Sequence, residues 1–295
     1  MANFGLKAFN KQFTQSVGNA GEVNINLRKN DANFILTLPI ISTGGANPIN
    51  ISLIYNHQDK TMNCGYGNGI RPSFYRKRQT ISNQQISLTN ADGSVDLFLK
   101  SNNYKNNDTC ETVVEHIPDY IHYYDYVFKV TGLNYKTNYS ESNAEYPYTI
   151  TSNNNTLRID RYTNDIILHN QSDNNYIKIL KNGNYYTTYL CMEKENENLV
   201  EKYRTEVDYS NINKIIITKK IGNTIISSSS VEFNNDYIIV EDQTLHVGKK
   251  YILNNNIVET ILEKRNNTFD EDHNIQINYI SSTLTTLTTN FIYHN

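Results

Sequence analysis

The residue types that usually carry metal or redox chemistry form no recognisable pattern here. The seven histidines contain no HxH or HxxxH pair. The most acidic run, residues 270–273, lacks the DxDxDG spacing of a calcium loop. The three cysteines, Cys64, Cys110 and Cys191, are too widely spaced for a zinc-ligand pair and allow at most one disulfide. We therefore expect free thiols, no metal and no other cofactor.

Catalytic and nucleotide-binding motifs are also missing. The glycine cluster Gly65-Tyr66-Gly67-Asn68-Gly69 matches neither GxGxxG nor GxxxxGK[ST], and it leads into a strand instead of a helix. We interpret it as a tight corner between strands. No GxSxG elbow occurs. A glycosidase-like carboxylate pair stays open, because its separation is a three-dimensional property, but no pair stands out and we expect no enzyme.

The best candidate for ligand binding is a tyrosine-dense segment, residues 120–130. If it is a strand, alternation places Tyr120, Tyr124 and Tyr126 on one side together with His122. Tyrosine rings can stack on sugars, although they serve equally well in an ordinary sandwich core. We name Tyr120, Tyr124 and Tyr126 as candidate residues for binding carbohydrate or a host receptor.

Charge argues against nucleic acid and membrane partners. With 27 Lys+Arg against 30 Asp+Glu, the formal net charge is -3, without the basic excess that phosphate binding needs. Arg76, Lys77 and Arg78 would alternate between two faces of a strand, so we expect them to protect a sheet edge. No apolar run is long enough to span a membrane, and residues 1–15 lack the apolar core of a Sec signal. We expect a cytoplasmic chain before any specialised export.

These side chains must be positioned by β-structure. The chain has 46 Asn and 23 Tyr among 295 residues, with only 13 Gly and 5 Pro. Short segments of period two, each closed by a turn signal, are typical of antiparallel sheet. The sequence predicts strands at 33–41, 49–55, 73–80, 85–89 and 94–99, with a type I turn at Asn90-Ala91-Asp92-Gly93.

Beyond residue 148, β-prone segments recur to the end of the chain. They are residues 149–151, 156–161, 165–169, 176–180, 185–192, 214–220, 224–233, 237–240, 250–253, 258–262 and 275–280. Asn182-Gly183 favours a type I′ hairpin. The one helix we allow is at 198–205.

The fold class is therefore all-β, a long antiparallel meander that forms a sandwich, an open barrel or a wound β-shell-like sheet. We divide the chain into a polar lead-in arm (1–22), an N-terminal β region (23–100) and a C-terminal antiparallel β region (101–295). The expected core of the N-terminal third comprises Leu36, Leu38, Ile51, Leu53, Tyr55, Leu97 and Phe98.

The N-terminal β region carries an ordered series of motifs. It contains Val23-Asn24-Ile25-Asn26, then Leu38-Pro39-Ile40 and Gly44-Gly45, then the strand from Pro48 to Asn56. The glycine corner at 65–69 and Asp92-Gly93-Ser94 with Phe98 follow. In order and spacing this segment resembles the entry segment of Rhs/YD-repeat β-shell proteins, over residues 23–98.

The resemblance implies a structural role, in which long strands form a wall that encloses or presents something and does no catalysis. Two departures are visible: Asn68-Gly69-Ile70 stands where the family has a Trp, and the repeating Tyr-Asp units are missing after residue 100. A surface or phage-tail-like adhesin is the alternative function, and a hydrolase on a β scaffold is a third. A loss of repeats would leave a strand edge open at residues 283–289, so we expect a protein partner or self-association there.

Overall fold

The computed structural model shows an all-β protein, as the sequence predicts. It describes residues 12–26, 33–45, 47–82, 85–101, 103–106, 117–118, 124–130, 135–139, 146, 149–152, 155–162, 165–170, 175–183, 185–265, 267–277 and 291–293. Within these residues, the helical elements are two short 3-10 turns, η1 (Gly18–Ala20) and η3 (His57–Asp59).

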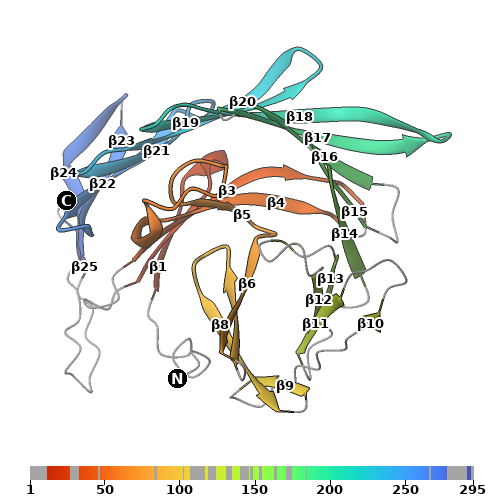
Figure 1. Ribbon diagram of the computed structural model, residues 1–295. Helices are drawn as coiled ribbons and strands as arrows, with labels where there is room; N and C mark the ends of the chain where they lie inside the picture. The colour runs from red at the N-terminus through yellow and green to blue at the C-terminus, as the bar shows by residue number, and fades with distance from the viewer. Residues whose placement is uncertain are drawn as a thin grey trace.

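The largest element is an antiparallel sheet in which, over the described residues, sixteen strands follow one another in sequence order. Each strand is hydrogen-bonded to the next along the chain, and Figure 1 shows the sheet curving as a broad arch. Its strands are β10 (Ile117–Pro118), β11 (Tyr124–Val130), β12 (Tyr135–Tyr139), β13 (Thr149–Ser152), β14 (Asn155–Arg161), β15 (Asp165–Asn170), β16 (Asn175–Asn182), β17 (Tyr186–Glu195), β18 (Asn198–Asn211), β19 (Lys214–Ile221), β20 (Thr224–Phe233), β21 (Tyr237–Asp242), β22 (Val247–Asn254), β23 (Ile257–Arg265), β24 (Thr268–Ile277) and β25 (Phe291–Tyr293). We call it the long sheet.

A five-stranded antiparallel sheet packs beneath this arch (Figure 1). We call it the inner sheet, and its strands are β1 (Gln12–Ser16), β2 (Glu22–Asn26), β3 (Phe34–Ser42), β4 (Asn50–Asn56) and β5 (Ile70–Pro72). A third sheet of four strands contains β6 (Arg76–Ser82), β7 (Gln85–Asn90), β8 (Val95–Ser101) and β9 (Asn103–Asn106). The strand β6, which carries Arg76, Lys77 and Arg78, lies at an edge of this third sheet.

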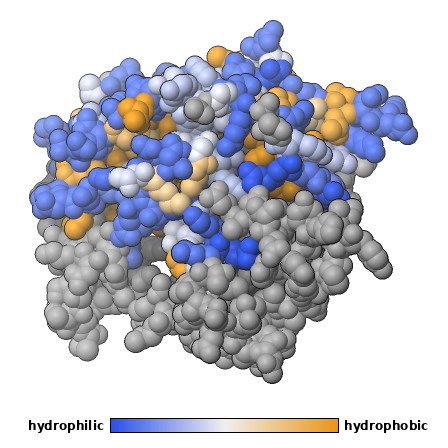
Figure 2. All heavy atoms as spheres, viewed as in Figure 1, coloured by the Kyte–Doolittle hydropathy of each residue, from blue (hydrophilic) through white to orange (hydrophobic). Residues whose placement is uncertain are grey.

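Alternating apolar residues explain why the two larger sheets face each other. In β4, Ile51, Leu53 and Tyr55 are buried, and in β19 Ile215 and Ile217 are buried. Buried side chains of both sheets belong to one continuous hydrophobic cluster, so the core lies between the two sheets, as in a β-sandwich. On the face shown in Figure 2, apolar side chains of the described residues appear as small separate patches among hydrophilic ones.

The expected core of the N-terminal third is confirmed where side chains are described. Leu36, Leu38 and Leu53 have no exposed surface, and Ile51 and Tyr55 are nearly as buried. The side chains of Leu97 and Phe98 lie outside the described set. A β-turn also forms at the predicted residues 90–93, between β7 and β8, since the Gly93 N–H donates to the Asn90 carbonyl at 3.0 Å.

Two local predictions are wrong. Residues 198–205 form part of the strand β18 and not a helix, because pairing with β17 overrides the helix propensity of Leu, Glu and Lys. Side chains 198–204 are not buried, which removes the alternation that would have indicated a strand. Part of the expected lead-in arm is also ordered: residues 12–16 form β1, and Val17 and Ala20 are buried in the core.

Candidate functional site

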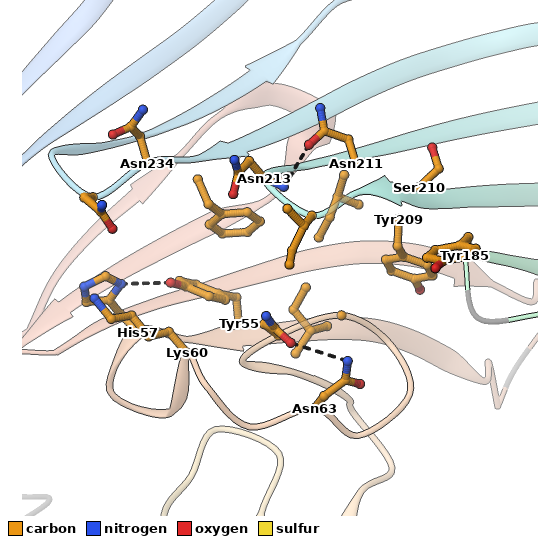
Figure 3. Close-up of a pocket in the computed structure, with 17 residues that line it drawn as sticks. Tyr55, His57, Lys60, Asn63, Tyr185, Tyr209, Ser210, Asn211, Asn213 and Asn234 are labelled. Atoms are coloured by element: carbon orange, nitrogen blue, oxygen red, sulfur yellow. Dashed lines mark hydrogen bonds between the residues drawn. The ribbon is translucent and has the colours of Figure 1, made fainter.

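The candidate site is a cleft of about 640 Å³ between one end of the long sheet and the loop that joins β4 to β5. Figure 3 shows this loop below the cleft and the β18–β19 and β20–β21 turns above it. The volume lies within the range of roughly 300–1,000 Å³ that is typical of small-molecule sites. The cleft therefore has room for a ligand of that size.

The loop below the cleft is held by side chains of its own and of β4 and β5. Asn56 caps η3 by accepting a hydrogen bond from the Gln58 N–H at 2.9 Å. The buried Arg71 forms an ion pair with Asp59 at 2.8 Å between Nη2 and Oδ2. Arg71 therefore serves as an internal anchor of this loop.

The glycine cluster forms the turn that borders the cleft. Gly65, Gly67 and Gly69 all have positive φ, the left-handed conformation that favours glycine. At Gly69 a Cβ would lie 2.9 Å from the Tyr55 ring and 3.0 Å from the Lys60 Cα, so this corner approaches β4 closely. The structure thus agrees with a tight corner at this cluster.

The inner end of the cleft contains an aromatic pair and a buried histidine. The rings of Tyr55 and Phe233 have centroids 4.5 Å apart, so β4 of the inner sheet meets β20 of the long sheet there. The Tyr55 hydroxyl and His57 Nδ1 are joined by a hydrogen bond of 2.8 Å (Figure 3). Burial lowers the pKa of His57, the Lys60 charge lowers it further, and the Asn256 side chain partly offsets this. Burial raises the pKa of Tyr55, which therefore stays protonated.

The upper rim consists of hairpin turns rich in asparagine. In an antiparallel meander every second turn lies at the same end of the strands. The turns after β16, β18 and β20 therefore bring together Tyr185, residues 211–213 and residues 234–235. The Asn211 Oδ1 accepts from the Asn213 N–H at 2.9 Å, which closes the β18–β19 turn.

The charge inventory of the cleft is small. Among the described residues its lining contains no Asp or Glu and one formally charged side chain, Lys60, which donates to the Asn256 Oδ1 at 2.7 Å. Ser210 also lines the cleft, but Figure 3 shows it at the opposite end from His57. The geometry therefore offers aromatic contact and neutral hydrogen bonds, and no serine–histidine pair.

The tyrosines that the sequence singled out are not among the described side chains that line this cleft. Tyr124 and Tyr126 lie on β11, where the structure describes the backbone but not the side chains, and Tyr120 lies outside the described residues. The 283–289 edge segment is also outside them. The proposed tyrosine face and the open edge remain predictions.

Cys64 and Cys191 are free thiols, and Cys110 is not among the described residues. Over the same part of the chain, no cluster of three His, Cys, Asp or Glu side chains has the arrangement of a metal site. Within the described ranges, no helix has the length and apolarity to cross a bilayer.

Sequence reasoning recognised Tyr55 as a core residue, and it missed the asparagine rim. The available signal was the recurrence of Asn at alternate turns, Asn211 and Asn213 and then Asn234 and Asn235. Neither a family model nor a curated protein matches the sequence.

Proposed function

We propose that the chain is a non-catalytic structural protein, a sheet wall like the opening part of an Rhs/YD-repeat shell, which encloses or presents a partner polypeptide. The observation that carries this proposal is the uninterrupted order of the long sheet. Each of its sixteen described strands is hydrogen-bonded to the next in sequence, without a crossover. Such a sheet grows by one strand at a time into a continuous surface.

Two further observations support the proposal. The motifs that carry the family resemblance fall on consecutive strands, with Val23 on β2, Leu38 on β3 and Leu53 on β4. The described residues that line the cleft include no carboxylate, and so do not supply the acid and base that glycoside hydrolysis normally requires. The adhesin alternative, with Tyr120, Tyr124 and Tyr126 as its ligand-binding face, remains a second prediction.

Enclosure can be tested with a passenger. A flexible, protease-sensitive polypeptide is fused after Asn295, with a site-specific protease site at the junction. If the sheet wall encloses it, a general protease digests the tethered passenger several-fold more slowly than the same passenger released at the junction. Equal digestion rates before and after release would rule out enclosure.

A further inference from the structure

An exposed aromatic ring stands at the rim of the cleft. The Tyr185 side chain is 60% exposed, and its hydroxyl makes no hydrogen bond with any described residue. Figure 3 shows it beside Tyr209, which is 7% exposed and lies in the cleft wall. Together with Tyr55 and Phe233, these rings line the cleft with apolar faces. A ring left open to water at a cavity mouth is placed to stack on a ligand.

The amide groups of the rim complement these rings. The side-chain oxygens of Asn63 and Asn211 already accept hydrogen bonds from the backbone N–H groups of Gly65 and Asn213, which lie in their own turns. The side-chain amides of Asn213 and Asn235 have no hydrogen-bond partner in the described part of the chain. Each such amide offers two donors and two acceptor lone pairs. The rim can therefore both donate to and accept from hydroxyl groups.

Other ligand classes fit this lining less well. A phosphate or carboxylate ligand would require positive charge, and Lys60 is already bonded to Asn256. An extended peptide would require an open strand edge, whereas the upper side of the cleft is built from closed hairpin turns. A lipid tail would leave the rim amides unsatisfied.

We propose that the cleft binds a neutral carbohydrate, an oligosaccharide of uncharged hexose units. A hexose has an apolar face of C–H groups and a periphery of hydroxyls. The face stacks on Tyr185, and the hydroxyls exchange hydrogen bonds with the amides of Asn213 and Asn235. This binding is independent of the wall proposal, which makes no use of the cleft.

The test is isothermal titration calorimetry of the full chain with maltotriose, lactose and tri-N-acetylchitotriose at millimolar concentration. We expect heat of binding with at least one of them. Tyr185→Ala should lower that affinity about tenfold, the upper part of the range for one aromatic contact. Tyr185→Phe should retain most of the affinity, because it keeps the ring. Asn213→Ala should lower the affinity several-fold.

Tyr162→Ala is the matched control, because Tyr162 is 62% exposed and lies outside the cleft. It should leave the affinity unchanged. Circular dichroism of each variant verifies that the fold is retained. Three results would overturn the proposal: no heat with any of the three sugars, equal affinity in the wild type and Tyr185→Ala, or tighter binding of 3′-sialyllactose or adenosine than of the neutral sugars.

Discussion

The Asp242 carboxylate accepts a hydrogen bond of 2.7 Å from the backbone N–H of Asn19, although 223 residues separate the two in sequence. Its other oxygen accepts from the N–H groups of Thr244 and Leu245, each at 3.0 Å. Asp242 has no exposed surface. One buried carboxylate thus joins η1, at the beginning of the inner sheet, to the turn after β21 in the long sheet.

Removal of this carboxylate should be costly. Asp242→Ala leaves three backbone N–H groups without their acceptor, and a buried unsatisfied donor costs about 1–3 kcal/mol. We expect the free energy of unfolding in urea to fall by at least about 3 kcal/mol. The exposed Asp236 serves as the control, and Asp236→Ala should change stability by less than about 0.5 kcal/mol. Similar values for the two variants would show that the Asp242 junction does not hold the sheets together.

The core of the inner sheet gives a second prediction. Leu53 has no exposed surface in the centre of β4, and truncation of a buried Leu costs about 2–5 kcal/mol. Leu53→Ala should therefore lower the midpoint of thermal unfolding clearly. Ile212→Ala, at a side chain that is 78% exposed, should leave the midpoint nearly unchanged. An unchanged midpoint in Leu53→Ala would contradict the packing of β4 against the long sheet.

Two glycines with positive φ differ in the space that a Cβ would find. A Cβ on Gly21 would lie 2.1 Å from the backbone carbonyl oxygen of Thr37, whereas a Cβ on Gly222 meets nothing within 4 Å. Both residues lie at positive φ, so both alanine variants bear a backbone cost: about 1–2 kcal/mol for the left-handed Gly222, and a larger one for Gly21, whose φ of 127° and ψ of -160° fall in a region that is essentially restricted to glycine. Gly21→Ala should lower the free energy of unfolding in urea measurably more than Gly222→Ala does, because the backbone at Thr37 must move to make room for the methyl group. Equal losses would mean that the β2–β3 region accommodates the methyl group freely.

The sequence predicted those parts of the fold in which one strand face is buried. Alternation identified Leu53 and its neighbours in β4 because the inner sheet has one core-facing side. It failed at residues 198–204, where no side chain is fully buried and pairing with β17 maintains the strand. The alternation of apolar and polar residues within one strand carries no information about its pairing with a neighbouring strand.

The cleft could not be predicted in the same way. Tyr55 and Phe233 are 178 positions apart in the sequence, and their contact depends on how the inner sheet packs against the long sheet. The order of the strands places the Asn-rich turns at one end of the long sheet. The sequence does not show which loop of the inner sheet lies opposite these turns. Sheet-on-sheet packing decides this, through side chains that are distant along the chain.

The buried His57 should make stability depend on pH. Burial and the nearby Lys60 charge lower its pKa in the folded state below the value of about 6.5 expected when unfolded. Between these two pKa values the unfolded chain binds a proton that the folded chain does not, so stability rises with pH there and is lost as pH falls through about 6.5.

His57→Gln removes this titration and keeps a polar side chain. The pKa of His169 is also lowered, mainly by burial, but His169 is present in both proteins and its contribution cancels in their difference. Urea unfolding at about pH 7.5 and about pH 5.5 brackets the unfolded-state value. The wild type should lose more stability between these two pH values than His57→Gln does. Parallel losses would mean that His57 takes up its proton equally in the folded and unfolded states, and that burial at the inner end of the cleft does not resist its charge.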